Sequence, residues 1–185
     1  DNLALGETEI KELEEIDLND NKKLCQVRDL FLLLCYTGQR FSDLQKINYS
    51  NIIDDQYLSI RQQKTKEVIT IPITTKVKQI LESYNGKLPK ISNVKFNVYL
   101  KELAQKIDSL NMEVGKNVDS SIIYKYDLIK SHTARRTFVT LNFSRGVELD
   151  VLKIGTGHKQ TKTLQSYVKM SDKQKADLLR SKLEK

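Results

Sequence analysis

The chemically active side chains of this chain gather in three short stretches. In TGQRFSDL, Arg40 follows a glycine turn at the end of an apolar helical run. In SHTARRTFVT, His132 precedes Arg135 by three residues, and in GHKQTKTLQSY, His158 precedes Tyr167 by nine. A guanidinium binds phosphate oxygens through paired hydrogen bonds, and an imidazole exchanges protons near neutral pH. The pattern therefore indicates chemistry on a phosphate, with helix capping by His132 and a surface role for Arg40 as the simpler alternatives.

The elements that must position these stretches are predicted to be mostly helices. Only seven Gly and two Pro interrupt 185 residues, which favours long helices over many short strands. Thr8 and Ser42 are the expected N-caps of the first and third helices, and Gly38 is expected to end the second. Apolar spacing predicts helices near residues 8–18, 20–36, 42–47, 75–84, 92–110, 133–145 and 148–155, with short helical pieces at 164–170 and 171–185. Gly155 or Gly157 should end the helix before the second histidine.

A β-hairpin is predicted between the helices. The stretch YLSIRQQKTKEVITIPI alternates polar and apolar residues in two runs, at 57–62 and 67–73. Alternation is typical of β-strands, so the two runs should pair antiparallel, with Lys64 and Lys66 at the tip of the hairpin. Residues 111–130 are polar and give no assignment.

The order of these features resembles that of the tyrosine recombinases, the family of phage and transposon integrases. The matching pieces are Thr-Gly-x-Arg, a hairpin lysine, His-x-x-Arg, Gly-His and a tyrosine, and they extend to Met170. The resemblance implies a tyrosine recombinase catalytic-domain fold, mainly α with a small antiparallel β-sheet, over residues 1–170. Residues 171–185 would form a C-terminal helix or tail that docks on a neighbouring protomer, with docking on its own domain as the alternative. The chain is expected to be a catalytic domain cut from a longer integrase that also carries an N-terminal DNA clamp.

The resemblance implies a specific reaction. In this family a tyrosine attacks a DNA phosphodiester, which gives a 3′-phosphotyrosyl link and a free 5′-hydroxyl before strand exchange and religation. Tyr167 would be the nucleophile, and His132 the base that takes its proton. Arg40 and Arg135 would bind the non-bridging oxygens of the transition state, and His158 would hydrogen-bond the phosphate. The bond energy stays in the protein–DNA link, so no cofactor and no metal ion is expected.

The lysine that protonates the departing 5′-oxygen should come from the hairpin tip. We predict Lys64 for this role, with Lys66 as the alternative, because the tip lacks the glycines that mark it in many members of the family. Asp43 follows Arg40 by three residues and is expected to support the surroundings of that arginine, or else to cap the short helix beginning near Ser42.

The distribution of charge favours a polyanionic partner. The formal net charge of the chain is +7, but residues 1–20 hold eight acidic side chains and one basic side chain, so residues 21–185 carry +14. A body this basic fits a nucleic acid as the partner, with solubility conferred by surface lysines as the alternative. The resemblance implies that the partner is double-stranded DNA, with self-association into a tetramer on DNA.

Other features narrow the class of protein. Cys25 and Cys35 belong to no CxxC or Cys/His cluster, so they are expected to be buried, reduced thiols. The apolar runs are shorter than the ~20 residues of a membrane span, and no signal peptide is evident, so a cytoplasmic location is expected. The remaining alternatives are a type IB-like topoisomerase with the same chemistry, an inactive DNA-binding regulator with the same fold, and a metal-dependent nuclease. The nuclease is disfavoured by the lack of metal ligands.

Overall fold

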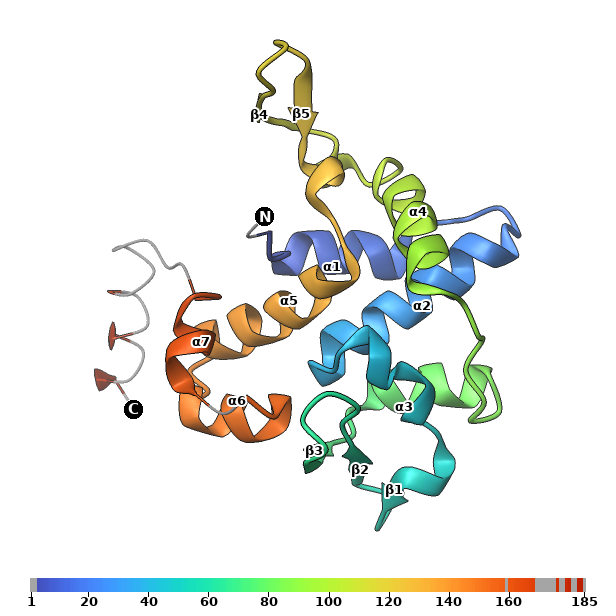
Figure 1. Cartoon of the computed structure of the whole chain (residues 1–185), viewed down its shortest axis with the longest axis vertical. Coiled ribbons are helices and arrows are strands. Elements are labelled where there is room, and N and C mark those ends of the chain that lie inside the picture. The colour runs from blue at the N-terminus through green and yellow to red at the C-terminus, as the bar shows by residue number, and fades with distance from the viewer. Residues whose placement is uncertain (1–2, 159, 169–175, 177–178, 181–182, 185) are drawn as a thin grey trace.

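The computed structural model describes residues 3–158, 160–168, 176, 179–180 and 183–184. Over these residues the chain is mainly helical with two small antiparallel sheets, which confirms the predicted fold class (Figure 1). The α-helices are α1 (Glu7–Glu15), α2 (Lys22–Thr37), α3 (Thr75–Ser83), α4 (Asn93–Ala104), α5 (Ser131–Ser144), α6 (Leu149–Thr156) and α7 (Thr161–Gln165). Short 3-10 helices are η1 (Phe41–Lys46), η2 (Tyr49–Asn51), η3 (Asp108–Leu110) and η4 (Lys125–Leu128). The predicted C-terminal helix or tail at 171–185 lies outside the described residues, apart from the few positions given above.

Helix α2 is the centre of the fold because its second half is apolar on every side. Residues 30–34 form an uninterrupted apolar run in which each side chain is at most 5% exposed. A helix that is apolar all round must be covered on all its faces. Helices α1, α3, α4 and α5 pack around it (Figure 1). Gly38 ends α2 in the left-handed region, at φ +66°, so Arg40 follows directly from the core.

The three-stranded sheet carries the predicted lysine loop. Strand β2 (Tyr57–Arg61) pairs antiparallel with β3 (Val68–Pro72), which confirms the predicted hairpin. Strand β1 (Ile52–Ile53) adds a third strand on the other side of β2, which the sequence did not reveal. The loop at residues 62–67 joins β2 to β3, and β2 contacts η1, so the loop is anchored beside the turn that follows α2.

A second hairpin projects from the opposite end of the fold (Figure 1). It consists of β4 (Glu113–Lys116) and β5 (Ile122–Tyr124), within the region that the sequence left unassigned. All the residues of β4 are exposed, so its side chains do not alternate between core and solvent. Strand prediction depends on that alternation, which explains the missing assignment.

Helices α5, α6 and α7 share a small apolar core of their own. It is made by Val139, Leu152 and Leu164, one from each helix, and Tyr167 packs against it. The sequence predicted a helical piece over 164–170, but α7 begins at Thr161 and ends at Gln165. Tyr167 therefore lies just after a helix end, held next to α5 by this second core.

Some predicted helix boundaries were wrong. The N-cap of α1 is Gly6 rather than Thr8. The segment after α2 is a 3-10 helix whose N-cap is Arg40 rather than Ser42. Of the two glycines proposed to end α6, Gly157 does so, in the left-handed region at φ +65°.

Two expectations about the rest of the chain can be compared with the structure. Both thiols are free, and Cys35 is buried, but Cys25 is partly exposed. Within the described residues, no helix has both the length and the apolar character needed to cross a membrane.

Candidate active site

The first turn of α5 carries His132. Helix α5 begins at Ser131 after the N-cap Lys130, whose backbone N–H donates to Thr133 Oγ1 at 3.0 Å. His132 therefore lies inside the helix, and the alternative that it caps the helix is wrong. Its Nε2 atom lies 3.1 Å from Tyr167 Oη, and the two rings meet edge to face. The side chains predicted as base and nucleophile are thus within hydrogen-bonding distance.

Arg135 lies one turn further along α5 and is only 1% exposed. Its Nη1 donates to the Gly38 carbonyl at 3.0 Å, and its Nη2 donates to the Thr156 carbonyl at 2.5 Å. Burial, followed by the charge of Arg40, lowers the pKa of Arg135 to about 9, so the guanidinium is still charged at neutral pH. Its Nε atom has no acceptor within the described residues. The side chain therefore joins the ends of α2 and α6, which fixes the position of its guanidinium.

His158 is held in its neutral form. Burial first, and then the charges of Arg135 and Arg40, lower its pKa to about 3. Its Nδ1 lies 2.8 Å from Thr156 Oγ1 and 3.1 Å from Arg135 Nη2, and its Nε2 lies 3.3 Å from the same Nη2. The guanidinium can only donate, so the neutral ring accepts from it through one nitrogen and carries its proton on the other. A hydrogen bond from His158 to a phosphate oxygen therefore requires that this N–H faces the anion.

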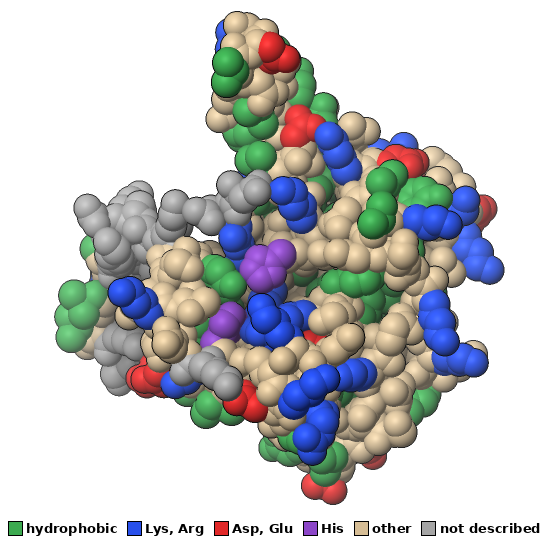
Figure 2. Space-filling view, viewed as in Figure 1, with side chains coloured by type: hydrophobic (Ala, Val, Ile, Leu, Met, Phe, Trp, Pro, Cys, Tyr) green, Lys and Arg blue, Asp and Glu red, His purple; other side chains and the backbone are tan. Residues whose placement is uncertain are grey.

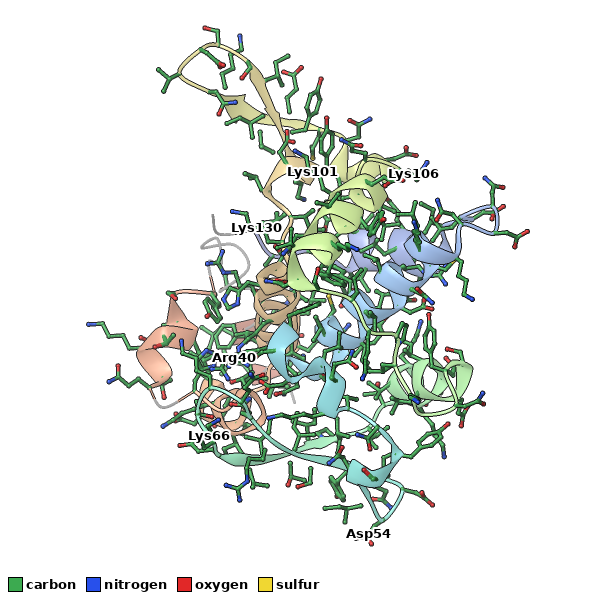
Figure 3. The ribbon with its side chains drawn as sticks, turned by 45° about the vertical axis from the view of Figure 1, so that its right-hand side comes forward. Arg40, Asp54, Lys66, Lys101, Lys106 and Lys130 are labelled. Carbon is green, nitrogen blue, oxygen red and sulfur yellow. The ribbon has the colours of Figure 1, made fainter. Side chains whose placement is uncertain are left out.

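Arg40 extends from the turn after α2 toward the loop between β2 and β3. Its Nη1 donates to Gln62 Oε1 at 2.8 Å, so the side chain is engaged within the fold rather than being a simple surface charge. In Figure 3, Arg40 lies between the part of this loop that carries Lys66 and the start of α5 at Lys130. Arg40 thus lies on the side of the molecule where α5 begins.

The loop lysines differ in their surroundings, although both are exposed. Lys64 is one of four cations that, after burial, lower the pKa of His132. Lys66 adopts a left-handed backbone at φ +62°, and its carbonyl accepts from Arg61 Nη1 at 3.1 Å. These observations favour Lys64 over Lys66 as the lysine next to the reacting groups, and the choice between them stays a prediction.

Asp43 is fully buried on η1. Its Oδ1 accepts from the backbone N–H of Gln63 at 2.6 Å and lies 3.8 Å from Lys46 Nζ. The carboxylate therefore anchors the start of the lysine loop. Its effect on the arginines is through charge, because it partly offsets the lowering of the Arg135 pKa by burial.

Positive charge surrounds His132. Its pKa is lowered first by burial and then by Arg136, Arg135, Arg40 and Lys64, in that order. The imidazole is therefore neutral at pH 7 and able to accept a proton. Figure 2 shows the histidine side chains next to a group of Lys and Arg side chains in the middle of one face.

Sequence reasoning missed Gln62, Thr156 and Arg136. The Arg136 guanidinium lies 5.5 Å from the centre of the Tyr167 ring, within the range of a cation–π contact. A signal for Arg136 was present, because it follows His132 by four residues and so shares its face of the helix. The carbonyl of Thr156 accepts from Gln62 and Arg135, which are far away in the chain, and no local spacing indicates this.

The arrangement suits proton and phosphate chemistry. A phenol lies against a neutral imidazole, and two guanidiniums and a loop lysine provide positive charge around them. Within the described part of the chain, no group of three or more His, Cys, Asp or Glu side chains is placed to hold a metal ion.

Comparison with known proteins identifies the family. Residues 4–174 match the sequence profile described as the phage integrase family. The chain belongs to this family. The result confirms the resemblance to tyrosine recombinases inferred from the motifs.

Curated relatives of this phage integrase family member are tyrosine recombinases. XerA of Saccharolobus solfataricus is 29% identical over 164 residues, which cover 86% of this chain and 52% of XerA. XerC of Rickettsia bellii is 25% identical over 175 residues, which cover 92% of this chain and 56% of XerC. The chain thus spans a little over half the length of these relatives.

Solved structures confirm the fold of this family member. The crystal structure of XerA recombinase matches with a TM-score of 0.68 at 16% identity, over 97% of this chain and 63% of XerA. The Tn1549 transposon integrase in complex with transposon right end DNA matches with a TM-score of 0.67 at 14% identity, over 100% and 67% of the two chains. The catalytic domain of bacteriophage HP1 integrase matches with a TM-score of 0.61 at 21% identity, over 90% and 87%.

Proposed function

We propose that this chain is the catalytic domain of a site-specific DNA recombinase that cleaves and rejoins DNA through Tyr167. The phenol oxygen attacks the phosphorus and forms a 3′-phosphotyrosyl bond while the bond to the 5′-oxygen breaks. The phenol proton passes to His132 Nε2, and the departing 5′-oxygen takes a proton from Lys64. A 5′-hydroxyl from the partner strand then reverses the reaction. No bond energy is lost, so no cofactor is consumed.

The arginines act on the charge that develops at phosphorus. The transition state concentrates negative charge on the non-bridging oxygens, and guanidiniums fixed before the reaction stabilise it without reorganisation. Arg135 is fixed by the carbonyls at the ends of α2 and α6, and Arg40 is held by Gln62. The neutral His158 would donate its one ring N–H to a phosphate oxygen.

The proposal rests on the contact between Tyr167 and His132. Tyr167 Oη lies 3.1 Å from a ring nitrogen of His132, and that imidazole has a lowered pKa. A phenol has a pKa near ~10 and needs a base to become a nucleophile. The family's motifs supply the other groups in the required order.

The test is covalent trapping on a nicked DNA half-site in the presence of EDTA. The wild-type chain should form a protein–DNA adduct that survives denaturing gel electrophoresis, and Tyr167→Phe should form none. Tyr57→Phe is the matched control, because Tyr57 is an exposed tyrosine on β2 and should leave the adduct unchanged. An adduct that persists in Tyr167→Phe, or cleavage that requires a divalent metal, would contradict the proposal.

We also propose that the domain assembles into a tetramer on DNA, with residues 171–185 docking on a neighbouring protomer. A structural neighbour, lambda integrase, forms a tetramer bound to a Holliday junction, which supports the proposal by analogy. Deletion of 172–185 should leave the thermal melting of the domain unchanged but weaken assembly on paired sites in gel-shift experiments. Unfolding of the shortened chain, or unchanged assembly, would count against docking in trans.

A further inference from the structure

The side chain of Gln62 is a buried polar group at the junction of the catalytic elements. It is 0% exposed, although it belongs to an otherwise exposed loop. Its Nε2 donates to Gln39 Oε1 and to the Thr156 carbonyl, each at 3.0 Å. Its Oε1 accepts from Arg40 Nη1 at 2.8 Å and from Thr65 Oγ1 at 2.9 Å. An amide has two donors and two acceptor sites, so every one of them is used.

These four contacts fix the orientation of the amide. If the amide were turned over, its NH₂ group would face the Arg40 guanidinium, and its oxygen would face the Thr156 carbonyl. Gln39 cannot compensate by turning, since its own Nε2 donates to the carbonyls of Thr37 and Gly155. The network therefore has one satisfied arrangement.

The contacts of Gln62 connect three separate parts of the candidate site. Arg40 comes from the turn after α2, and Thr65 belongs to the loop that also carries Lys64. Thr156 is the last residue of α6, directly before the turn to His158. Its carbonyl oxygen also accepts from Arg135. One amide thus links the two arginines, the lysine loop and the histidine segment.

Gly157 makes room for this amide. A Cβ atom at position 157 would lie only 2.3 Å from Gln62 Oε1, and the backbone there has a φ of +65°. Glycine is thus required at this position both by the left-handed backbone and by the close approach of Gln62. The helix end is shaped around the amide group.

We infer that Gln62 is a positioning residue for strand cleavage, which holds the Arg40 guanidinium at the phosphate. The inference rests on the proposed function. A guanidinium on a flexible stem has many rotamers, and a fixed acceptor selects one of them before DNA binds. Pre-set geometry raises the rate of the chemical step more than it raises affinity for DNA.

The experiment measures single-turnover adduct formation at saturating nicked half-site, together with the Kd for the same DNA. Gln62→Met keeps the length of the side chain but removes both hydrogen-bonding groups. We expect its cleavage rate constant to fall by between about 10-fold and about 100-fold, while Kd changes by less than about 3-fold. Gln79→Met is the matched control, because Gln79 is exposed on α3, and its rate should equal that of the wild type.

A double variant separates positioning of Arg40 from a general structural effect. Lysine cannot reproduce the planar fork of arginine, so Arg40→Lys alone should also slow cleavage. If Gln62 acts through Arg40, adding Gln62→Met to Arg40→Lys should slow cleavage by less than about 3-fold further. Losses that multiply in the double variant would overturn the inference, and so would a folded Gln62→Met protein with wild-type cleavage.

Gln62→Glu decides the question if Gln62→Met does not melt cooperatively. Glutamate keeps an acceptor for Arg40 but loses both donors and places an oxygen against the Thr156 carbonyl. A slowed cleavage step with unchanged Kd would support the inference, and a wild-type rate would overturn it. A wild-type chain that forms no adduct on this DNA would instead contradict the proposed function, and the inference with it.

Discussion

His132 and Arg136 are separated by one turn on the same face of α5, and their proximity has a functional consequence. Arg136 is the largest charge contribution to the lowered pKa of His132, after burial. An imidazole that remained protonated could not accept the phenol proton. The cation therefore favours the neutral form of the predicted base, in addition to any attraction that it exerts on a phosphate.

This coupling predicts a shift in pH dependence. At saturating DNA, the rate constant for adduct formation should stay constant as the pH is lowered from about 7.5 toward the pKa of His132. At pH values below that pKa, the rate constant should fall, because the imidazole becomes protonated. In Arg136→Gln the pKa of His132 should rise toward its ordinary value of 6.5, because a cation is lost. The acid limb should therefore move to higher pH.

The measurement is a series of single-turnover cleavage rates between about pH 4.5 and about pH 7.5. Arg145→Gln is the control, since Arg145 lies just past the other end of α5, paired with Glu7. Its acid limb should match that of the wild type. An acid limb that stays in place in the Arg136 variant would contradict the coupling.

The candidate site could be predicted from sequence only as far as its side chains recur in short motifs. The side chains predicted as nucleophile and base and the two predicted arginines were chosen in this way, and the resemblance assigned their roles. Gln62 had a weaker signal, because it continues the inward-facing series of Leu58 and Ile60 along one strand, where a polar residue is unusual. Its partners Gln39 and Thr156 could not be found, because those contacts exist only after distant segments have folded together.

At the scale of elements, most helices were predictable because they bury one face with a regular spacing, and α2 was predictable from its long apolar run. The second hairpin was not, since every side chain of β4 is exposed, and β1 is only two residues long. The wrong N-caps have a common cause, which is that Thr8 and Ser42 are good capping residues located close to the true helix starts. The type of a residue therefore predicts that a helix starts nearby better than it predicts the exact N-cap position.

The end of α2 gives a testable consequence at this scale. Gly38 has a φ of +66°, and a Cβ atom there would lie 2.4 Å from the Phe138 ring on α5. Gly38→Ala should lower the free energy of unfolding by at least about 1–2 kcal/mol, the cost of a side chain in the left-handed region, because the ring must also move. Urea denaturation measures this change.

Gly115→Ala is the matched control for Gly38→Ala. Gly115 lies in β4, and a Cβ atom there meets nothing within 4 Å. We expect this variant to unfold within about 0.5 kcal/mol of the wild type, as exposed substitutions usually do. Equal stability of the two variants would mean that the helix end does not depend on glycine.

At the scale of the whole molecule, the acidic side chains of the N-terminal segment form ion pairs with basic side chains that lie outside the candidate site. Within the described residues, no ion pair links Arg40, Arg135, Lys64 or Lys66 to an acidic side chain. Three acids of α1 instead pair with cations from other parts of the chain. These pairs are Glu7 with Arg145, Glu9 with Lys125, and Glu14 with Lys76. The charge of the candidate site is therefore left available for a polyanion.

This separation of charge predicts how DNA binding depends on salt. Each phosphate that a lysine or arginine neutralises releases condensed counterions, so the logarithm of the binding constant should fall linearly with the logarithm of salt concentration, with a slope of about −0.9 per contact. Fluorescence anisotropy on Tyr167→Phe measures binding without covalent trapping. Lys64→Met should make the slope less steep by about 1. Arg145→Met should leave it unchanged, because Arg145 pairs with Glu7 about 20 Å along α5 from His132. Equal slopes for the Lys64 variant and its parent would show that Lys64 contacts no DNA phosphate.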